Sequence, residues 1–258
     1  MPIALVTGAS TGIGRHVAEE LARRGHDLVL VARSSDELTA LRDAWQAAYH
    51  VQVHIRACDL SEEGAAERLY GELRRTLPVP DVVVNNAGFG DVGVFHDAEW
   101  EKLGRMLQLN VLAVTRLTHL ALAEMRARGS GRIMNLASCA AFSPGPLMAV
   151  YFATKAYVLH FSEAIAQECV GTGVTVTALC PGATRTRFHT TAGFSDGTRL
   201  FSSPFAAEAE GVAIYGVRAM FAGRRVAVPG FSNRLSLLAI RVLPRRLMTV
   251  ITHRLFRR

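Results

Sequence analysis

Four polar residues in the middle of the chain have the types and spacing for acid–base chemistry on an oxygen atom. Tyr151 and Lys155 are four residues apart, so a helix would place them on one face, and Asn110 and Ser138 precede them. A tyrosine titrates near pH 10, and a nearby ammonium favours the phenolate, which lowers the tyrosine pKa. Ser138 offers the same oxygen a second hydrogen bond. These residues predict a site where a phenol moves a proton while charge develops on a substrate oxygen.

Each of these residues also has an ordinary structural interpretation. A tyrosine and a lysine four apart on a helix are most often a surface pair, and Ser138 could simply start a turn at a strand end. Asn110 lies among apolar neighbours and needs hydrogen-bonding partners if it is buried. The rest of the chain must therefore decide whether the four residues form a site.

A glycine-rich segment near the amino terminus supplies that context. Residues 7–14 read Thr-Gly-Ala-Ser-Thr-Gly-Ile-Gly, directly after a short apolar run and before a segment with helical periodicity. Glycines let a strand turn sharply into a helix whose free N–H groups face a pyrophosphate. The spacing differs from the usual G-x-G-x-x-G, and a turn of this kind can also be a mere tight loop. Its position after the first predicted strand favours dinucleotide binding.

Short β-branched runs alternate with longer segments of helical period along the whole chain. This order is typical of βαβ units and a parallel sheet. The runs Leu28–Val31 and Val82–Val84 are apolar on both faces, as in strands covered by helices on each side. We expect strands near 3–7, 27–32, 51–57, 81–85, 131–137, 173–180 and 225–228, and helices near 13–24, 35–48, 62–75, 99–128, 150–170 and 205–222. The fold class is therefore predicted as α/β, a doubly wound parallel sheet in one Rossmann-type domain.

These motifs, taken in order, resemble the short-chain dehydrogenase/reductase family. The series is Thr7-Gly8 to Gly14, Asn85-Asn86-Ala87-Gly88, Asn110, Ser138, Tyr151-x-x-x-Lys155 and Pro181-Gly182. The resemblance covers about residues 3–190 and implies bound NAD(H) or NADP(H), reversible carbonyl/alcohol chemistry and a homo-oligomer. It also implies that Lys155 holds the nicotinamide ribose and that Asn110 anchors a water chain returning protons to Lys155. The catalytic residues would be Asn110, Ser138, Tyr151 and Lys155.

The resemblance also assigns residues to the cofactor. The predicted cofactor-binding residues are Gly8, Ser10, Thr11, Gly12, Ile13, Gly14, Arg33, Asp59, Leu60, Asn86, Ala87, Gly88, Tyr151, Lys155, Pro181, Gly182, Thr184 and Thr186. Asp59 resembles the family residue that contacts the adenine amino group.

The end of the second predicted strand bears on the choice between the two cofactors. An acidic residue there would repel a 2′-phosphate, whereas Arg33 would neutralise it, so NADP(H) is favoured over NAD(H). Many NADP-preferring relatives carry a second basic residue where this chain has Thr11. Arg33 could also be an ordinary solvated arginine.

The substrate is indicated only by apolar residues near these motifs. Residues 187–205 contain four phenylalanines among Gly, Ser and Thr, which suits a lid over the reacting carbonyl. The four are Phe188, Phe194, Phe201 and Phe205, and Phe89, Phe95, Phe142 and Met148 are expected around the same cavity. We therefore expect an apolar or elongated substrate, although these phenylalanines could equally pack a normal core.

Composition excludes several other classes of protein. The chain has 258 residues, 50% of them hydrophobic, and fits one catalytic domain over residues 1–233. We expect no export signal, no membrane span, no metal site and four reduced cysteines, and hence a cytoplasmic protein. No hydrolase triad is found among its histidines.

The last 25 residues form a basic amphipathic extension, residues 234–258, that the family pattern explains least. They contain seven arginines and no acid, and so account for the whole formal net charge of +7. This local charge argues against a nucleic-acid-binding surface. Apolar residues at helical spacing follow Pro244, and they could dock on the protein itself or on another subunit, or lie on an acidic membrane surface. The protein is then cytoplasmic or peripheral at the membrane.

Two functions remain open from the sequence. The first is an oxidoreductase that transfers a hydride between NADP(H) and an apolar carbonyl or secondary alcohol, with Tyr151 as acid/base. The second is a catalytically silent nucleotide-binding scaffold or sensor whose basic tail contacts a partner or a membrane. The complete set Asn110, Ser138, Tyr151 and Lys155 favours the enzyme.

Overall fold

The structure is a computed structural model that describes residues 1–194 and 206–256. The expected lid over residues 187–205 is therefore described only in part, and Phe201 and Phe205 lie outside the described residues.

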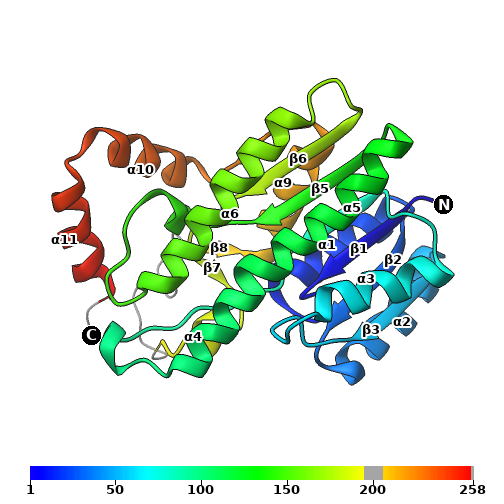
Figure 1. Cartoon of the computed structure of the whole chain (residues 1–258), viewed down its shortest axis with the longest axis horizontal. Helices are drawn as coiled ribbons and strands as arrows, with labels where there is room; N and C mark the ends of the chain where they lie inside the picture. Colours follow the sequence, from blue (N-terminus) through cyan, green and yellow to red (C-terminus); the bar gives the residue numbers. More distant parts are fainter. Residues whose placement is uncertain (195–205, 257–258) are drawn as a thin grey trace.

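A seven-stranded parallel sheet forms the centre of the molecule (Figure 1). The strands are β1 (Ile3–Thr7), β2 (Asp27–Ala32), β3 (Val53–Ala57), β4 (Val82–Asn85), β5 (Gly131–Leu136), β6 (Val174–Leu179) and β9 (Val226–Ala227). Their order is β3-β2-β1-β4-β5-β6-β9, and every neighbouring pair is parallel. The chain order reverses between β1 and β4, and ligands bind at such a point beyond the carboxyl ends of the strands. The predicted doubly wound fold is confirmed, with each main strand within two residues of its expected position at either end.

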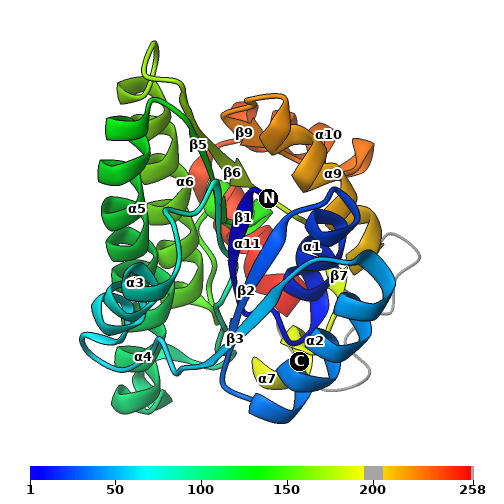
Figure 2. The same ribbon diagram turned by 90° about the vertical axis from the view of Figure 1, so that its right-hand side faces the viewer.

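Helices cover both faces of the sheet (Figure 2). The covering helices of one face are α1 (Gly12–Arg23), α2 (Ser35–Tyr49) and α9 (Ala209–Phe221), and those of the other are α3 (Ala65–Thr76), α5 (Val114–Arg128) and α6 (Ala149–Glu168). Side chains alternate along each strand, so β1 sends Ala4 and Val6 into one core and Ile3 and Leu5 into the other. Burying each such large apolar side chain stabilises the fold by about 1.5–3 kcal/mol.

The helical stretch from α4 to α5 brings one catalytic candidate to the site. α4 (Trp100–Leu107) continues through a π-helical turn, η2 (Gln108–Ala113), into α5. By length and composition alone, Trp100–Arg128 could cross a membrane. Part of its apolar content is used in the core, because α5 packs Leu117 and Met125 against the sheet.

The carboxyl-terminal segment forms two helices, α10 (Phe231–Val242) and α11 (Arg245–Phe256), joined at Leu243 and Pro244. In Figure 1 these two helices lie at the left, outside the sheet and its covering helices. We call residues 231–256 the C-terminal arm. The expected boundary between residues 233 and 234 falls inside α10, because that helix begins directly after Gly230.

Three kinds of short element around the sheet's carboxyl edge were not expected from the sequence. A 3₁₀ turn, η3 (Cys139–Phe142), follows β5, and another, η1 (Phe95–Asp97), precedes α4. Two-residue strands β7 (Thr184–Arg185) and β8 (Ala207–Glu208) pair in parallel, and α7 (Phe188–Thr191) follows β7. Residues of η3, β7 and α7 line the cavity described next.

Candidate active site

A cavity of about 1250 Å³ opens beyond the carboxyl ends of the central strands. It is lined by the glycine turn after β1, the loops after β2 to β6, one face of α6 and the inner face of the C-terminal arm. Drug-sized ligands occupy roughly 300–1,000 Å³, so this volume suits a dinucleotide together with a second molecule. Among the predicted site residues, only Gly14 and Asn110 do not line it.

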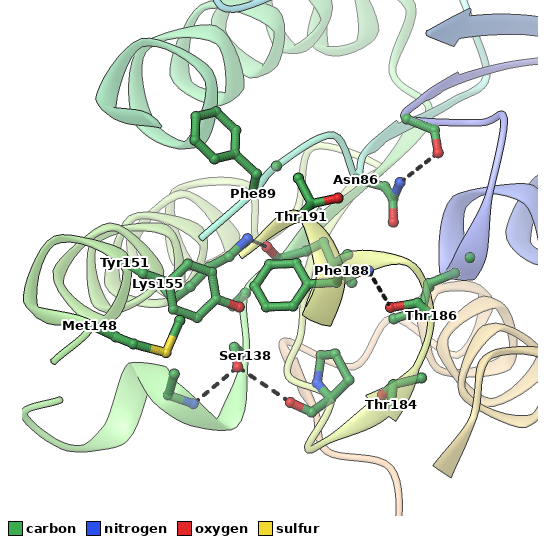
Figure 3. A pocket seen from close by; sticks show the side chains of 18 of the residues that line it. Asn86, Phe89, Ser138, Met148, Tyr151, Lys155, Thr184, Thr186, Phe188 and Thr191 are labelled. Carbon is green, nitrogen blue, oxygen red and sulfur yellow. Dashed lines mark hydrogen bonds between the residues drawn. The ribbon is translucent and has the colours of Figure 1, made fainter. Parts of the chain in front are cut away.

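Ser138 and Tyr151 face each other at the centre of this cavity (Figure 3). Ser138 follows β5 by two residues and has extended backbone, and its hydroxyl accepts a hydrogen bond from the Ala140 N–H at 3.1 Å as the cap of η3. The same hydroxyl donates to the Pro181 carbonyl at 3.5 Å and hydrogen-bonds the phenol of Tyr151. The strand end, the cap and the loop after β6 therefore fix the serine hydroxyl beside the phenol.

Lys155 lies one helical turn beyond Tyr151 on α6, as the spacing predicts. Its side chain is only 5% exposed, and its Nζ lies 5.8 Å from the centre of the Tyr151 ring. The ammonium donates to the Leu136 carbonyl at 2.7 Å, which directs it toward the end of β5. The carbonyl thus supplies the polar partner that a buried cation requires.

The pKa of Tyr151 moves in the direction opposite to the expected one. Burial raises the pKa of this tyrosine to about 12, and the hydrogen bond with Ser138 lowers it only in part. Burial also lowers the pKa of Lys155 to about 8. A low-dielectric environment disfavours both charged forms, the phenolate and the ammonium. The site therefore holds a protonated phenol at neutral pH.

Asn110 is buried in the π-helical turn and ties the loop after β4 to α6. Its amide Nδ2 donates to the Phe89 carbonyl at 2.9 Å and to Thr154 Oγ1 at 3.2 Å, while its Oδ1 accepts from the Phe89 N–H at 3.2 Å. Thr154 in turn donates to the Tyr151 carbonyl at 2.7 Å. π-turns of this kind occur often at functional sites, because they displace one side chain from helical register. Here the asparagine contacts the Phe89 backbone directly, and it is linked to the Tyr151 carbonyl through Thr154.

Gly88 shows how close Asn110 and Lys155 come to each other. A Cβ at Gly88 would lie 3.0 Å from Asn110 Oδ1 and 3.5 Å from Lys155 Nζ. Both polar groups thus converge on the same glycine, at the bottom of the cavity.

The glycine turn fits a dinucleotide. α1 begins at Gly12 with no acidic residue in its first turn, and Thr11 makes no side-chain cap, so the first N–H groups are left for an anion. Gly8 and Gly12 have φ of 64° and 57°, which other residues rarely adopt. Gly14 does not line the cavity, and a Cβ there would overlap the Gly8 carbonyl, so it permits the close approach of helix and strand.

Asn86 holds the glycine turn against the end of β4. Its side-chain amide donates to the carbonyls of Thr7 and Gly8 at 2.9 and 3.1 Å. The Thr7 hydroxyl accepts from the N–H groups of Asn86 and Ala87, each at 3.0 Å. Figure 3 shows Asn86 with one of these contacts. The expected cofactor residues Asn86 and Ala87 therefore also position the phosphate turn.

The end of the cavity beyond β2 and β3 is lined by Arg33, Asp59 and Leu60. The carboxylate of Asp59 accepts from the N–H and hydroxyl of Ser61 at 2.9 and 2.6 Å, and pairs with Arg105 at 2.7 Å. Burial opposes the carboxylate charge, but the Ser61 bonds and Arg105 hold the pKa of Asp59 below its ordinary value. Asp59 would thus meet an adenine as an acceptor already oriented by its neighbours.

The loop after β6 closes the cavity from the other side. Pro181, Gly182, Thr184 and Thr186 all line it. The Thr184 hydroxyl donates to the Gly182 carbonyl at 3.0 Å, and the methyl group of Thr186 would lie 3.1 Å from a Cβ at Gly12. The loop therefore reaches across to the glycine turn.

Arg187 joins the same loop to α2. Its guanidinium contacts Glu37 at 2.7 Å, across the nucleotide end of the cavity. The hydrogen bond from Arg187, together with one from Ser10, holds the pKa of Glu37 below its ordinary value, although burial opposes this. The sequence pattern had not singled out either partner.

The outer half of the cavity is apolar. Met148, Phe152, Ala192 and Phe194 form one buried cluster, and the ring of Phe188 lies 5.3 Å from that of Tyr151. Phe256 at the end of α11 packs on this cluster, with ring centres 5.7 Å from Phe152 and 5.9 Å from Phe194. The remaining apolar lining comes from the C-terminal arm, through Ala239, Ile240, Leu243, Met248, Ile251, Leu255 and Phe256.

Two expected lining residues lie elsewhere. Phe95 is 61% exposed in η1 and lies beside a second, much smaller pocket, and Phe142 packs in a separate core cluster behind β5. Both follow the cavity motifs closely in sequence, but η1 and η3 turn their rings away. Phe89, Met148, Phe188 and Phe194 do line the cavity. Among the described residues, no group of three His, Cys, Asp or Glu side chains could hold a metal ion.

The fold and the cavity define a Rossmann-type protein with a serine, a tyrosine and a lysine at the carboxyl edge of its sheet. The sequence profile of the family described as short chain dehydrogenase matches residues 2–194. The chain therefore belongs to the short-chain dehydrogenase/reductase family, a family of oxidoreductases.

Known relatives and solved structures of this family are similar to the chain. The ketoacyl reductase HetN of a Nostoc species is 35% identical over 178 residues, which are 69% of this chain and 62% of HetN. The very-long-chain 3-oxoacyl-CoA reductase of Mus musculus is 33% identical over 184 residues, 69% of this chain and 58% of the mouse protein. The chain thus matches about six tenths of the length of these relatives. A short-chain dehydrogenase from Sphingobium yanoikuyae, solved in complex with NADPH, has a TM-score of 0.84 at 33% identity, covering 93% of this chain and 92% of the other.

Proposed function

We propose that this protein is an NADP(H)-dependent oxidoreductase that interconverts an apolar, elongated carbonyl compound and its secondary alcohol, with Tyr151 as the acid/base. The observation that carries this proposal is the shared cavity. The Tyr151 phenol and the Ser138 hydroxyl lie between a turn suited to a dinucleotide and an apolar outer half. The named activities of the ketoacyl and 3-oxoacyl-CoA reductases support the same substrate class.

The chain's own residues suit the reductive direction. A bound nicotinamide would supply the hydride at the carbonyl carbon. The Tyr151 phenol, protonated at neutral pH, would donate its proton to the carbonyl oxygen, and Ser138 would donate a hydrogen bond to the same atom. Lys155 would then lie 5.8 Å from the ring that carries the new phenolate charge. Asn110 would keep α6 and the loop after β4 in register during this transfer.

Arg33 supports NADP(H) over NAD(H). It lines the cavity at the end of β2, where a guanidinium can pair with a 2′-phosphate. We expect Arg33→Ala to raise the KM for NADPH about tenfold or more while leaving the KM for NADH nearly unchanged. Steady-state kinetics with both cofactors measure this, and an equal change for both would contradict the assignment.

The function is tested by following NADPH absorbance with 3-oxoacyl thioesters and simple ketones of increasing chain length. Turnover should improve with chain length, and Tyr151→Phe should lower kcat/KM by about 10³-fold and Ser138→Ala by about 100-fold. Nucleotide binding, measured by fluorescence, should persist in both variants. If the parent protein binds NADPH but reduces none of these compounds, or if Tyr151→Phe keeps full activity, the proposal is wrong.

Homo-oligomerisation and a cytoplasmic location remain predictions. Light scattering on the purified protein measures the first.

A further inference from the structure

The C-terminal arm presents an apolar stripe on the side that faces away from the cavity. Phe231, Leu235, Leu238 and Val242 are 80%, 58%, 59% and 85% exposed. Their spacing of four, three and four residues places them on one face of α10. None of the four lines the cavity. We call these four residues the outer stripe.

The opposite face of α10 already has a structural role. Leu237 is buried, and Asn233, Ser236, Ala239 and Ile240 line the cavity. The cavity face of the helix is therefore mixed in polarity, whereas the outer stripe is wholly apolar and takes no part in covering the cavity. An exposed stripe of four large residues is unfavourable in water unless something covers it.

Charge around the stripe favours an anionic partner. α10 and α11 contain no acidic residue, and exposed arginines stand at positions 234, 245, 246 and 254. Arg234 keeps its own contacts to the Val228 carbonyl at 3.0 Å and the Tyr215 hydroxyl at 2.8 Å, so its charge is held beside the stripe. A second copy of this arm would bring the same cations against them, which opposes pairing of two arms.

α11 carries further exposed apolar side chains. Leu247 and Val250 are 46% and 48% exposed, and Ile251 and Leu255 are 38% and 59% exposed while also lining the cavity. Arg246 and Arg254 stand on the same helix.

We propose that the C-terminal arm binds the surface of an anionic phospholipid membrane, with the outer stripe inserted among the lipids and the arginines against the headgroups. Large apolar side chains flanked by cations are the chemistry that such a surface recognises.

Vesicle co-sedimentation of the full chain tests the binding without any assay of activity. The full chain should bind vesicles of phosphatidylcholine with about 30% phosphatidylglycerol, and bind vesicles of phosphatidylcholine alone much more weakly. Raising the salt from about 0.1 M to 1 M shortens the screening length from about 10 Å to 3 Å, so binding should fall.

Matched variants separate the stripe from general surface effects. Leu235→Ser combined with Leu238→Ser should weaken vesicle binding by about a hundredfold. Leu112→Ser is the control, because Leu112 is 55% exposed in η2, outside the C-terminal arm. For the charges, Arg245→Gln with Arg246→Gln should weaken binding to anionic vesicles, and Arg75→Gln with Arg126→Gln should not. Circular dichroism and NADPH binding show that each variant is folded.

Three results would overturn the proposal. The first is no binding of the full chain to anionic vesicles, and the second is equal loss in the Leu112→Ser control. The third is an oligomer, in the absence of vesicles, that Leu235→Ser with Leu238→Ser dissociates, because the stripe would then be an interface between copies. Loss of reductase activity with intact vesicle binding would instead contradict only the proposed function.

Discussion

At the scale of single residues, Lys155 lies in a buried position that disfavours its charged form. The ammonium donates a hydrogen bond to the Leu136 carbonyl at 2.7 Å, and burial lowers the pKa of this lysine to about 8. A residue held in this way lowers stability, and active sites often carry such a cost because the group is needed for chemistry. The cost can be measured, since it depends on pH.

We expect Lys155→Met to inactivate the enzyme and to stabilise the fold at neutral pH. Below pH 8 the lysine is charged in both states, so the folded protein bears the full burial cost, about 3 kcal/mol from the difference between 10.5 and 8. Loss of the Leu136 hydrogen bond offsets about 1 kcal/mol. The net gain in unfolding free energy should be about 2 kcal/mol.

The sign of the pH dependence follows from the lowered pKa. Between pH 8 and 10.5 the unfolded chain binds a proton that the folded one has released, so the unfolding free energy of the parent protein rises with pH. The methionine variant lacks this rise, and its advantage should shrink across that window. Urea unfolding of both proteins at about pH 7 and pH 10 measures the difference. A methionine variant that is less stable at pH 7, or a difference independent of pH, contradicts this account.

At the scale of elements, the C-terminal arm interlocks with the loop after β6. A Cβ at Gly182 would overlap the side-chain amide of Asn233 on α10, 2.6 Å from its Nδ2. The same amide group donates to the Pro229 carbonyl at 2.7 Å, which fixes its position. The predicted cofactor residue Gly182 is thus small because α10 packs on it.

We expect Gly182→Ala to destabilise the protein by about 1–3 kcal/mol and to weaken NADPH binding. Asn233→Ala removes the obstructing amide and alone should cost about 1 kcal/mol for its hydrogen bond. The double variant should therefore lose less unfolding free energy than the two single variants lose in sum. Denaturant unfolding and nucleotide titration of all four proteins measure the coupling. Strict additivity would show that Gly182 and Asn233 do not constrain each other.

The same elements show what the sequence could and could not predict. The main strands could be located because runs such as Val82–Val84 are apolar on both faces, and Tyr151 and Lys155 because their spacing is local. The start of α10 could not be predicted from the sequence. Gly230 offers no side-chain cap, and the face of the helix toward the cavity carries Asn233 and Ser236, so the apolar periodicity of a core-facing helix is missing.

Contacts that depend on distant parts of the chain also escaped prediction. Nothing near Phe256 indicates that it will pack on Phe152, about a hundred residues earlier in the sequence. The direction of the Tyr151 pKa shift was wrongly expected for a related reason. The spacing to Lys155 is visible in the sequence, but the burial that raises the pKa involves distant residues such as Phe188, whose ring lies 5.3 Å from that of Tyr151.

At the scale of the whole molecule, one cavity is assembled from both ends of the chain. Residues of the glycine turn near position 10 and of α11 near position 255 line the same space. The elements at the carboxyl edge of the sheet position Ser138, Tyr151 and Lys155, and the C-terminal arm forms much of the apolar outer half of the cavity. Substrate length should therefore be set by the arm, and hydride and proton transfer by the sheet.

We expect Ile240→Trp, which fills part of the outer cavity, to lower kcat/KM for long-chain carbonyl substrates by about tenfold or more. Activity on a short ketone should hardly change, because the reacting half of the cavity is untouched. Val242→Trp is the matched control on the same helix, since Val242 is 85% exposed and does not line the cavity. Kinetics with a chain-length series in vesicle-free buffer give the comparison. Equal losses on short and long substrates would contradict this division of the cavity.

The interlock of Gly182 with Asn233 bears on protein engineering. Exchanging the arm for that of a homologue, in order to alter the substrate range, also replaces Asn233, which packs against Gly182 in the loop after β6. Chimeras should be built with both segments taken from the same parent.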